Sequence, residues 1–276
     1  MPTHLIVIAG ILYYNNTMKK LILIILIFTS FTVYSQNSKY HLGSAKTLTG
    51  NIYVLACFIS DYNNQWTDSE KQVMINKLHN TQSWLKKQAA NYGVTVDFDG
   101  GNFGFQNDIK IPNINYGTGS GAEDVNILTT VFKEIGYSSN LAFYDWVLKN
   151  TKSKNTFVIF FVKGQGRSYS IAYESELMNK EKYFVECAVL YNQYWGGLEM
   201  YEASMAHEIL HLFGAWDLYE TFQQSKEKEL RARQYFPNSI MLRTTYNINE
   251  LMVDELTAWL IGWNNTQQSW YEWFKP

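Results

Sequence analysis

The sequence predicts an α+β fold in which a mixed β-sheet is backed by helices. Runs of apolar and β-branched residues at 51–60, 157–162 and 183–191 have the length and composition of strands. Apolar residues recur at helical spacing after residue 67 and again over 199–213. Strands that alternate with helical segments in this way form one sheet with helices packed against it.

The segment 51–60 and the residues after it predict a strand followed by a helix. Apolar and β-branched residues fill 51–60, and the turn-forming run 61–64 comes next. Thr67 is expected to be the N-cap of the helix, because Glu70 three residues later completes a capping box. Apolar residues then recur at helical spacing, so we expect this helix to end near 91–93.

The following stretch predicts a short strand and a long loop. Residues 94–98 have the composition of a strand, and 99–102 contain a Gly-Gly pair that is typical of a turn. Residues 101–121 are rich in glycine and are expected to be a loop. Within them Gly117–Gly121 superficially resembles a phosphate-binding loop. It lacks the Gly-Lys-Ser/Thr ending, so we interpret it as an ordinary loop.

Two helices and two strands are expected next. Helical patterns cover 123–135 and 141–148. The unbroken apolar run 157–162 predicts a buried central strand, and 183–191 predicts a further strand.

The C-terminal part is predicted to be helical or irregular. A helix over 199–213 follows the last strand and carries apolar residues on the side that must face a core. A long polar connection then leads to a final helix over 248–261.

The overall composition is that of a globular protein. Of 276 residues, 46% are hydrophobic and 16% are aromatic, and the formal net charge is −2. This near-balanced charge argues against a nucleic acid as partner. The sequence contains no internal repeat or heptad run, which excludes repeat and fibrous proteins. We therefore expect residues 36–276 to form a single domain. The sequence does not indicate an oligomeric state.

Residues 18–35 have the features of a signal peptide. A lysine pair precedes the apolar run 21–28, and a segment of small residues ends at Ser35, near which we place the cleavage site. Residues 1–17 are then explained by an upstream start, with translation beginning at residue 18. The apolar run is shorter than the roughly 20 residues of a spanning helix. We therefore expect a secreted, periplasmic or cell-surface protein without a stable membrane anchor.

The two cysteines of the predicted mature chain, Cys57 and Cys187, both lie in apolar strand-like runs. In an exported protein they can pair with each other. Buried free thiols that pack as small hydrophobic groups are an equally good interpretation.

The strongest functional signal lies in residues 206–217, which read Ala-His-Glu-Ile-Leu-His-Leu-Phe-Gly-Ala-Trp-Asp. Residues four apart on a helix share one face, so the imidazoles of His207 and His211 can bind one cation. Glu208 lies about 100° around the helix from His207, where its carboxylate reaches a water molecule beside the metal rather than the metal itself. These residue types predict a Zn²⁺ site with Glu208 as general base.

A catalytic zinc site usually has three protein ligands and one open position. Gly214 follows His211 by three residues and can adopt the left-handed conformation that ends a helix. Such a turn brings Asp217 back toward the metal. Asp217 is therefore our predicted third ligand.

The pattern His-Glu-x-x-His-x-x-Gly-x-x-Asp resembles the metzincin clan of metallopeptidases, specifically its snapalysin-like members with Asp in the last position. The resemblance covers about 199–263 and is highly specific over 207–217. It implies a zincin-like fold, with a mixed sheet, backing helices, an active-site helix and a helical or irregular C-terminal part. It also implies a tight turn with a methionine beneath the zinc, for which Met241 within 239–242 is the candidate.

Other third ligands remain open. The commonest third ligand of the clan is histidine, and no histidine follows His211. Glu250 and Asp254 have the spacing of the gluzincin pattern, in which a later glutamate binds zinc and an aspartate orients a histidine. Glu220 is a weaker contender. If Asp217 binds the metal, Asp254 or Glu255 is expected to support the ligands or simply to cap structure.

The predicted function is that of a zinc-dependent endopeptidase that acts on a protein or peptide substrate. Glu208 takes a proton from the attacking water and delivers it to the leaving amine. We expect the substrate to pair with an exposed edge strand, for which 183–191 is the candidate. Tyr246 is either an oxyanion donor or a packing residue. Two other hypotheses are a surface binding or adhesion module that keeps the fold without turnover, and a hydrolase of a non-peptide amide.

Overall fold

The computed structural model describes residues 42–60, 64–110 and 130–276, apart from the side chain of Lys110. The predicted leader, the segment before it, His41 and the Gly117–Gly121 loop all lie outside the described residues. In the ranges that are described, no helix combines the length and apolar character that a membrane span requires.

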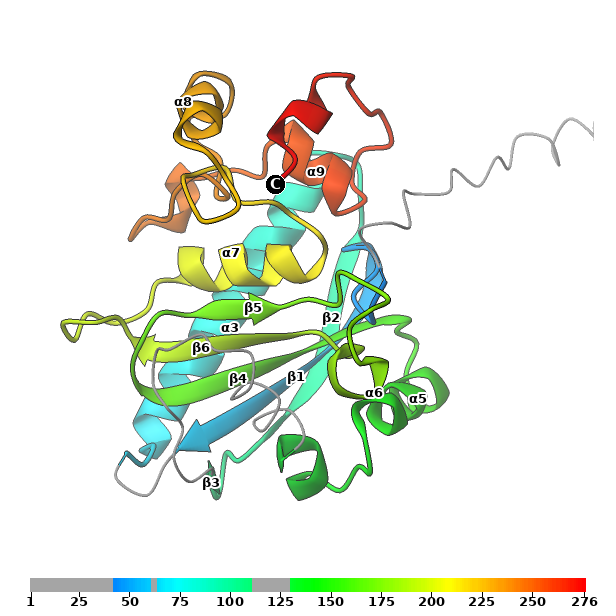
Figure 1. Ribbon diagram of the computed structural model, residues 1–276. Helices are drawn as coiled ribbons and strands as arrows, with labels where there is room; N and C mark the ends of the chain where they lie inside the picture. Colours follow the sequence, from blue (N-terminus) through cyan, green and yellow to red (C-terminus); the bar gives the residue numbers. More distant parts are fainter. Residues whose placement is uncertain (1–41, 61–63, 111–129) are drawn as a thin grey trace, which may run out of the picture. The chain divides into compact units, whose positions relative to one another are not determined.

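The described strands form a six-stranded mixed sheet with the order β2-β1-β4-β6-β5, and β3 pairs with the end of β1 (Figure 1). Strands β1, β2, β3, β4 and β6 run parallel, and β5 pairs antiparallel with β6 at the edge. The strands span Gly50–Ser60 (β1), Val96–Phe103 (β2), Ile109–Lys110 (β3), Asn155–Gln165 (β4), Tyr169–Ile171 (β5) and Cys187–Gln193 (β6).

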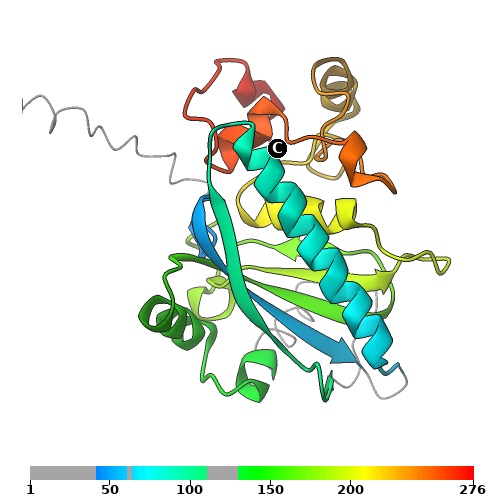
Figure 2. The ribbon, with the colours of Figure 1, turned by 180° about the vertical axis from the view of Figure 1, so that it is seen from behind.

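The helices connect and cover these strands (Figures 1 and 2). The α-helices span Asp68–Ala90 (α3), Asn140–Asn150 (α5), Lys180–Tyr183 (α6), Glu202–Leu212 (α7), Lys226–Tyr235 (α8) and Glu255–Leu260 (α9). Two short 3₁₀ helices lie at Ile248–Glu250 (η2) and Tyr271–Phe274 (η3). Helix α3 begins as predicted, because the side chains of Thr67 and Glu70 form a reciprocal capping box.

The sheet separates two hydrophobic cores, because neighbouring residues of a strand point to opposite faces. In β4, Phe157, Ile159 and Phe161 belong to one core, and Val158 and Phe160 belong to the other. The first core is covered by α3, α7 and the C-terminal segments, and the second by α5 and its neighbours. Burial on both faces explains why β4 reads as an unbroken apolar run.

Helix α7 lies on the first face, where it contacts α3, β5 and β6 (Figure 2). Met205, Ala206, Ile209 and Leu210 of this helix are fully buried. They hold α7 in a fixed position beside the edge strand β5. The predicted α+β class, a mixed sheet with backing helices, is confirmed.

Several predicted boundaries are wrong for local reasons. Strand β2 continues through 99–102, which we expected to be a turn. The strand expected from Tyr183 begins only at Cys187, because Lys180–Tyr183 is helical. The helix expected from Glu199 begins at Glu202, since Glu199 forms an extended bridge with Gln193.

The C-terminal segment also differs from the prediction. The polar connection after α7 contains α8, whose Glu229 is buried and pairs with Lys226 and Arg233. The helix predicted over 248–261 is divided into η2 and α9. The division occurs because Asp254 has an extended backbone and caps α9 through a hydrogen bond from the Thr257 amide.

The two cysteines, Cys57 and Cys187, are free and buried. Both belong to the second core, on the face of the sheet that α5 covers. The interpretation as small hydrophobic core residues therefore holds.

Candidate metal centre

Helix α7 presents two histidines on one face near its C-terminal end. His207 and His211 are one helical turn apart, and their ring centroids are 4.6 Å apart. The buried apolar residues of α7 prevent the helix from rotating, so the two rings are held in this relation. The predicted spacing of two imidazoles on one helix face is present.

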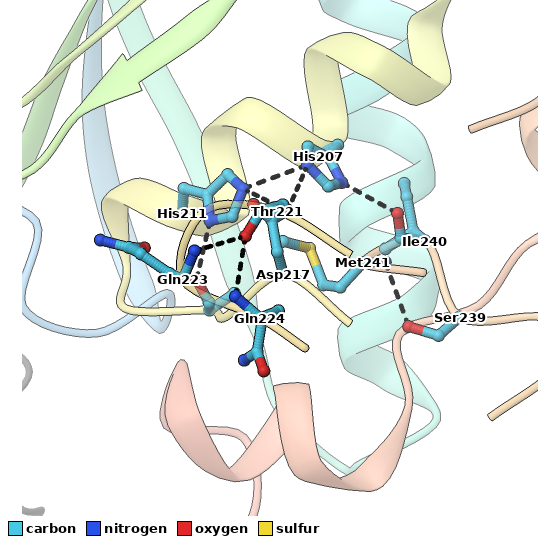
Figure 3. A network of polar contacts seen from close by, with 10 residues as sticks. His207, His211, Asp217, Thr221, Gln223, Gln224, Ser239, Ile240 and Met241 are labelled. Atoms are coloured by element: carbon cyan, nitrogen blue, oxygen red, sulfur yellow. Dashed lines mark hydrogen bonds and ion pairs between the residues drawn. The ribbon is translucent and has the colours of Figure 1, made fainter. Parts of the chain in front are cut away.

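Asp217 lies against both histidines, so the three predicted ligand groups meet at one point (Figure 3). The Nε2 atoms of His207 and His211 are 3.1 Å apart. The Oδ1 atom of Asp217 is 3.1 Å from each Nε2 atom. These three residues are the one group of potential metal ligands in the described part of the chain, with all donor atoms within 4.8 Å of one another.

Backbone carbonyls fix the orientation and the tautomer of both rings. The Nδ1 atom of His207 lies 3.0 Å from the Ile240 carbonyl oxygen, and Nδ1 of His211 lies 2.8 Å from the Ala215 carbonyl oxygen. A carbonyl oxygen can only accept a hydrogen bond, so each Nδ1 must carry the proton. In the neutral rings the Nε2 lone pairs therefore point toward each other and toward Asp217.

The turn after α7 explains how Asp217 reaches the histidines. Gly214 has φ 91°, the left-handed conformation predicted from the sequence. Its amide donates to the His211 carbonyl, and the Ala215 amide donates to the Leu210 carbonyl. Together these bonds form a Schellman motif, which ends the helix and reverses the chain. The same turn presents the Ala215 carbonyl to His211.

A second turn, at 237–242, supports the centre from the other side. It carries the Ile240 carbonyl, and Figure 3 shows the Met241 side chain directed toward His207 and Asp217. Met241 is fully buried, and its carbonyl accepts a hydrogen bond from the Leu218 amide. The segment that carries Asp217 is thereby joined to the turn that orients His207.

Asp254 holds this second turn in place. Its carboxylate accepts a hydrogen bond of 2.6 Å from the Ser239 hydroxyl, and the same hydroxyl oxygen accepts from the Met241 amide. Asp254 also caps α9 through Thr257. The connection from α9 to His207 therefore runs through Asp254, Ser239 and the main chain of the turn.

Burial and mutual attraction set the ionisation of the group. Burial lowers the pKa of His211, but the hydrogen bond and charge of Asp217, with the charge of Glu208, raise it to about 9. Burial raises the pKa of Asp217, but the hydrogen bonds from His207 and His211 bring it well below its usual range. The raised pKa of His211 and the lowered pKa of Asp217 indicate a local field that favours positive charge, either a proton or a metal ion.

The donor set fits zinc. Two neutral imidazole nitrogens and one carboxylate oxygen are the ligand types of catalytic zinc sites. Zinc bonds of about 2.0–2.1 Å at tetrahedral angles separate ligand atoms by about 3.3 Å, and the three atoms here are 3.1 Å apart. A zinc ion bound here would replace the proton that His211 shares with Asp217.

Glu208 lies beside the group and faces open space. It is half-buried and lines two cavities, one of about 470 Å³ that also contains Arg243 and one of about 500 Å³ that also contains Asp217. We call them the Arg243 cavity and the Asp217 cavity. Among the described residues no group forms a hydrogen bond or ion pair with the Glu208 carboxylate. Its carboxylate is therefore free to exchange a proton with a molecule bound in the cavities.

Tyr219 lines both cavities, and its ring is 6.0 Å from that of His207. Burial and the charge of Asp217 raise its pKa to about 12, and the nearby guanidinium of Arg167 offsets part of this rise. Tyr246, the predicted oxyanion or packing residue, is 82% exposed and lies 5.6 Å from the ring of Tyr201. Tyr219 is therefore better placed than Tyr246 to reach a bound molecule.

The alternative ligands lie apart from the group of three. Glu250 is exposed and accepts a hydrogen bond from Asn247. Glu220 lines the Asp217 cavity but is exposed, with its carboxylate 3.7 Å from Lys226. The geometry therefore favours Asp217 as third ligand over Glu250 and Glu220.

The strand predicted to receive a substrate is not at an edge. Strand β6 is paired on both sides, by β4 and by β5, so its main chain cannot accept another strand. The edge strand is β5, whose three residues were too few to be recognised in the sequence. Tyr169 and Ser170 of β5 line the Asp217 cavity.

The sequence did not indicate Tyr219, Arg167 or Arg243 as site residues. Tyr219 is two residues beyond Asp217, so extending the motif 207–217 by two residues would include it. Arg243 directly follows the turn at 237–242 and could be found in the same way. Arg167 comes from the approach to β5 and carries no local signal, because only the fold brings it to the site.

Comparison with known proteins adds little to this description. Neither a protein-family model nor a curated protein matches the sequence. A solved structure, metalloproteinase-II from Bacteroides fragilis, resembles the chain with a TM-score of 0.36 and 13% sequence identity over 80% of this chain. The matched region spans 55% of the length of that protein.

Proposed function

We propose that this chain is a zinc-dependent peptidase in which His207, His211 and Asp217 hold the metal and Glu208 is the general base. The observation that carries the proposal is the convergence of two Nε2 atoms and one carboxylate oxygen at 3.1 Å, with both Nδ1 protons committed to carbonyls. The motif resembles that of metzincins, and we propose membership of that clan on these residues alone.

A zinc ion in such a site polarises a carbonyl group and makes water more acidic. Glu208 faces both cavities beside the ligands, where it can accept the proton of an attacking water. The same carboxyl group then delivers this proton to the leaving amine. Tyr219 lies next to His207 and has a pKa raised to about 12, so it stays protonated and can donate a hydrogen bond to an oxyanion.

The site is open enough for a peptide. The two cavities share His207 and Glu208 in their lining, and the Asp217 cavity reaches the edge strand β5. An extended substrate can add to such an edge through main-chain hydrogen bonds. We therefore propose a protein or peptide substrate, and export of the chain by the leader at 18–35.

The test compares the wild type with Glu208→Gln after both have been loaded with zinc. We expect both proteins to hold one zinc ion, and the variant to hydrolyse an unfolded protein at least about 100-fold more slowly, because a positioned general base contributes about 10²–10⁴-fold. Metal content is measured by atomic absorption and hydrolysis by release of new amino termini.

Other outcomes separate the competing functions. A wild type that takes up no zinc would contradict the metal centre. Zinc in both proteins with no hydrolysis by either supports a binding or adhesion module that has the same fold. Equal hydrolysis by both proteins would exclude Glu208 as the base. Cleavage of non-peptide amides in place of peptides would support a hydrolase of such amides.

A further inference from the structure

The Arg243 cavity has an unusual charge composition for a site beside a general base. Apart from Glu208, its charged lining residues are Arg167 and Arg243. Neither arginine has an ion-pair partner among the residues that the structure describes. Two guanidinium groups therefore face one cavity in which Glu208 is the single acidic residue of the described lining, and neither of them forms an ion pair with a described residue.

Hydrogen bonds fix the main chain at or next to both arginines. The Arg243 amide donates to the Ser239 carbonyl in the turn that supports His207. The residue before Arg167 is Gly166, and its amide donates to the Gln193 carbonyl. Gly166 also packs closely on the Tyr191 ring, because a Cβ at this position would lie 2.7 Å from the ring. The positions of the two arginines are therefore determined by the same elements that build the metal centre.

The guanidinium groups retain free donors. Arg243 donates through Nη2 to Asn238 at 3.2 Å, and Arg167 lies near the Tyr219 hydroxyl. A guanidinium has five N–H donors, so each arginine keeps several for a bound molecule. Ser168, Ser204 and Thr244 in the same lining add neutral hydroxyl groups.

The Asp217 cavity has the opposite character. Its lining includes Glu174, Asp217 and Glu220, with Arg167 as its one basic residue among those described. Arg167 and Glu208 line both cavities, so a molecule that occupies both meets Arg243 in the first and Glu174, Asp217 and Glu220 in the second. This contrast gives a bound chain a preferred direction.

We propose that the Arg243 cavity selects a carboxylate of the substrate, held by Arg167 and Arg243, next to the bond that is cleaved. The proposal rests on the peptidase function and adds its specificity. Arginine binds carboxylates through two parallel hydrogen bonds, which a neutral amide of the same shape cannot reproduce. The carboxylate is either an acidic side chain or the free C-terminus of a peptide.

The experiment uses the zinc-loaded full chain and two sets of internally quenched peptides. One set replaces Glu with Gln at each position beside the cleaved bond, and the other compares a free C-terminus with an amidated one. We expect kcat/KM to be at least about tenfold higher for the carboxylate form in one of the two sets, as a charge-assisted hydrogen bond implies. The responding set identifies the source of the carboxylate.

The variants are Arg167→Glu and Arg243→Glu, with Arg231→Glu as the matched control. Arg231 is exposed and lies over the ring of Trp273, outside the lining of either cavity. We expect the carboxylate preference to be lost or reversed in the two cavity variants and retained in the control. Thermal unfolding of each protein checks that the folds are comparable.

A binding measurement separates this inference from the peptidase function. Fluorescence anisotropy with labelled peptides and Glu208→Gln reports affinity without turnover. A preference for the carboxylate that disappears with Arg243→Glu supports the cavity assignment even if no peptide is cleaved. Equal affinity and equal cleavage for both forms, or a preference that both cavity variants keep, overturns it.

Discussion

The three donor atoms of the candidate metal centre differ in how far the sequence constrains them. His207 and His211 are four residues apart on α7, so helical geometry alone brings them together. Asp217 comes from beyond the helix and depends on the turn at Gly214. Glu250, the other candidate for a third ligand, lies on η2, exposed and hydrogen-bonded to Asn247.

Removing the Asp217 carboxylate should therefore weaken zinc binding, and removing the Glu250 carboxylate should not. Asp217→Ala deletes an atom that lies 3.1 Å from both Nε2 atoms. We expect it to lower zinc affinity by more than about 100-fold, because even residues that only orient ligands contribute 10–100-fold. Glu250→Ala is the matched control. Competition with a chromogenic chelator measures both, and a loss confined to Glu250→Ala would reassign the third ligand.

Residues that meet through local geometry could be predicted, and those that meet only through the fold could not. The histidine spacing and the glycine turn were readable, because both act over fewer than ten residues. The Ile240 carbonyl that accepts from His207 and the two arginines of the Arg243 cavity come from segments far from 207–217. No periodicity or spacing connects such segments in the sequence.

The turn that ends α7 is the element on which the third ligand depends. At φ 91° Gly214 has a backbone conformation that costs a residue with a Cβ about 1–2 kcal/mol. We expect Gly214→Ala to destabilise the protein by about that amount. It should also weaken zinc binding, since the turn delivers both the Ala215 carbonyl and Asp217. Urea unfolding and chelator competition test the two effects.

Gly136 provides the control for this turn. It has φ 92°, and a Cβ there would meet no atom within 4 Å. Gly136→Ala should lose a similar amount of stability while zinc affinity is unchanged. If both alanine variants bind zinc as the wild type does, the turn at Gly214 does not position Asp217.

Gly214→Asn should recover part of the stability that Gly214→Ala loses, because asparagine tolerates the left-handed region.

The predictions for β2 and for the helix over 248–261 were wrong because single residues have roles there that the local sequence pattern does not reveal. Gly100 and Gly101 suggested a turn, but β2 passes so close to β1 that a Cβ at Gly100 would collide with the Val54 carbonyl oxygen. Glycine is thus required there by the neighbouring strand and not by a reversal of the chain. Asp254 similarly divides the last helix by acting as an N-cap, a signal that the apolar pattern of 248–261 concealed.

At the scale of the described molecule, the buried acid Glu186 links residues 44–45 to the sheet. Glu186 is 3% exposed and accepts hydrogen bonds from the amides of Ala45 and Tyr173. Burial raises its pKa to about 8; the two backbone hydrogen bonds lower it and the charge of Glu174 raises it further. The folded protein therefore holds this proton at pH values where the unfolded chain has released it.

The sign of the resulting pH dependence follows from linkage. Between about pH 4.5 and 8 the folded state binds more protons than the unfolded state, so the contribution of Glu186 to stability is complete below this window and is lost as pH rises through it. We expect Glu186→Gln to show a smaller fall in unfolding free energy from pH 5 to pH 8 than the wild type. Urea unfolding at both pH values, with exposed Glu176→Gln as control, measures the difference. Identical pH profiles for all three proteins would contradict it.

The carbonyls of Ala215 and Ile240 that orient the two histidines are main-chain groups, and every amino acid carries one. A substitution at either position leaves the acceptor in place, so neither position has to keep its residue for the rings to stay oriented. Both positions are buried in the first core, so related sequences can carry other apolar residues of similar size there while they retain the same centre. What they must conserve is loop length, because a single inserted or deleted residue would carry the acceptor away.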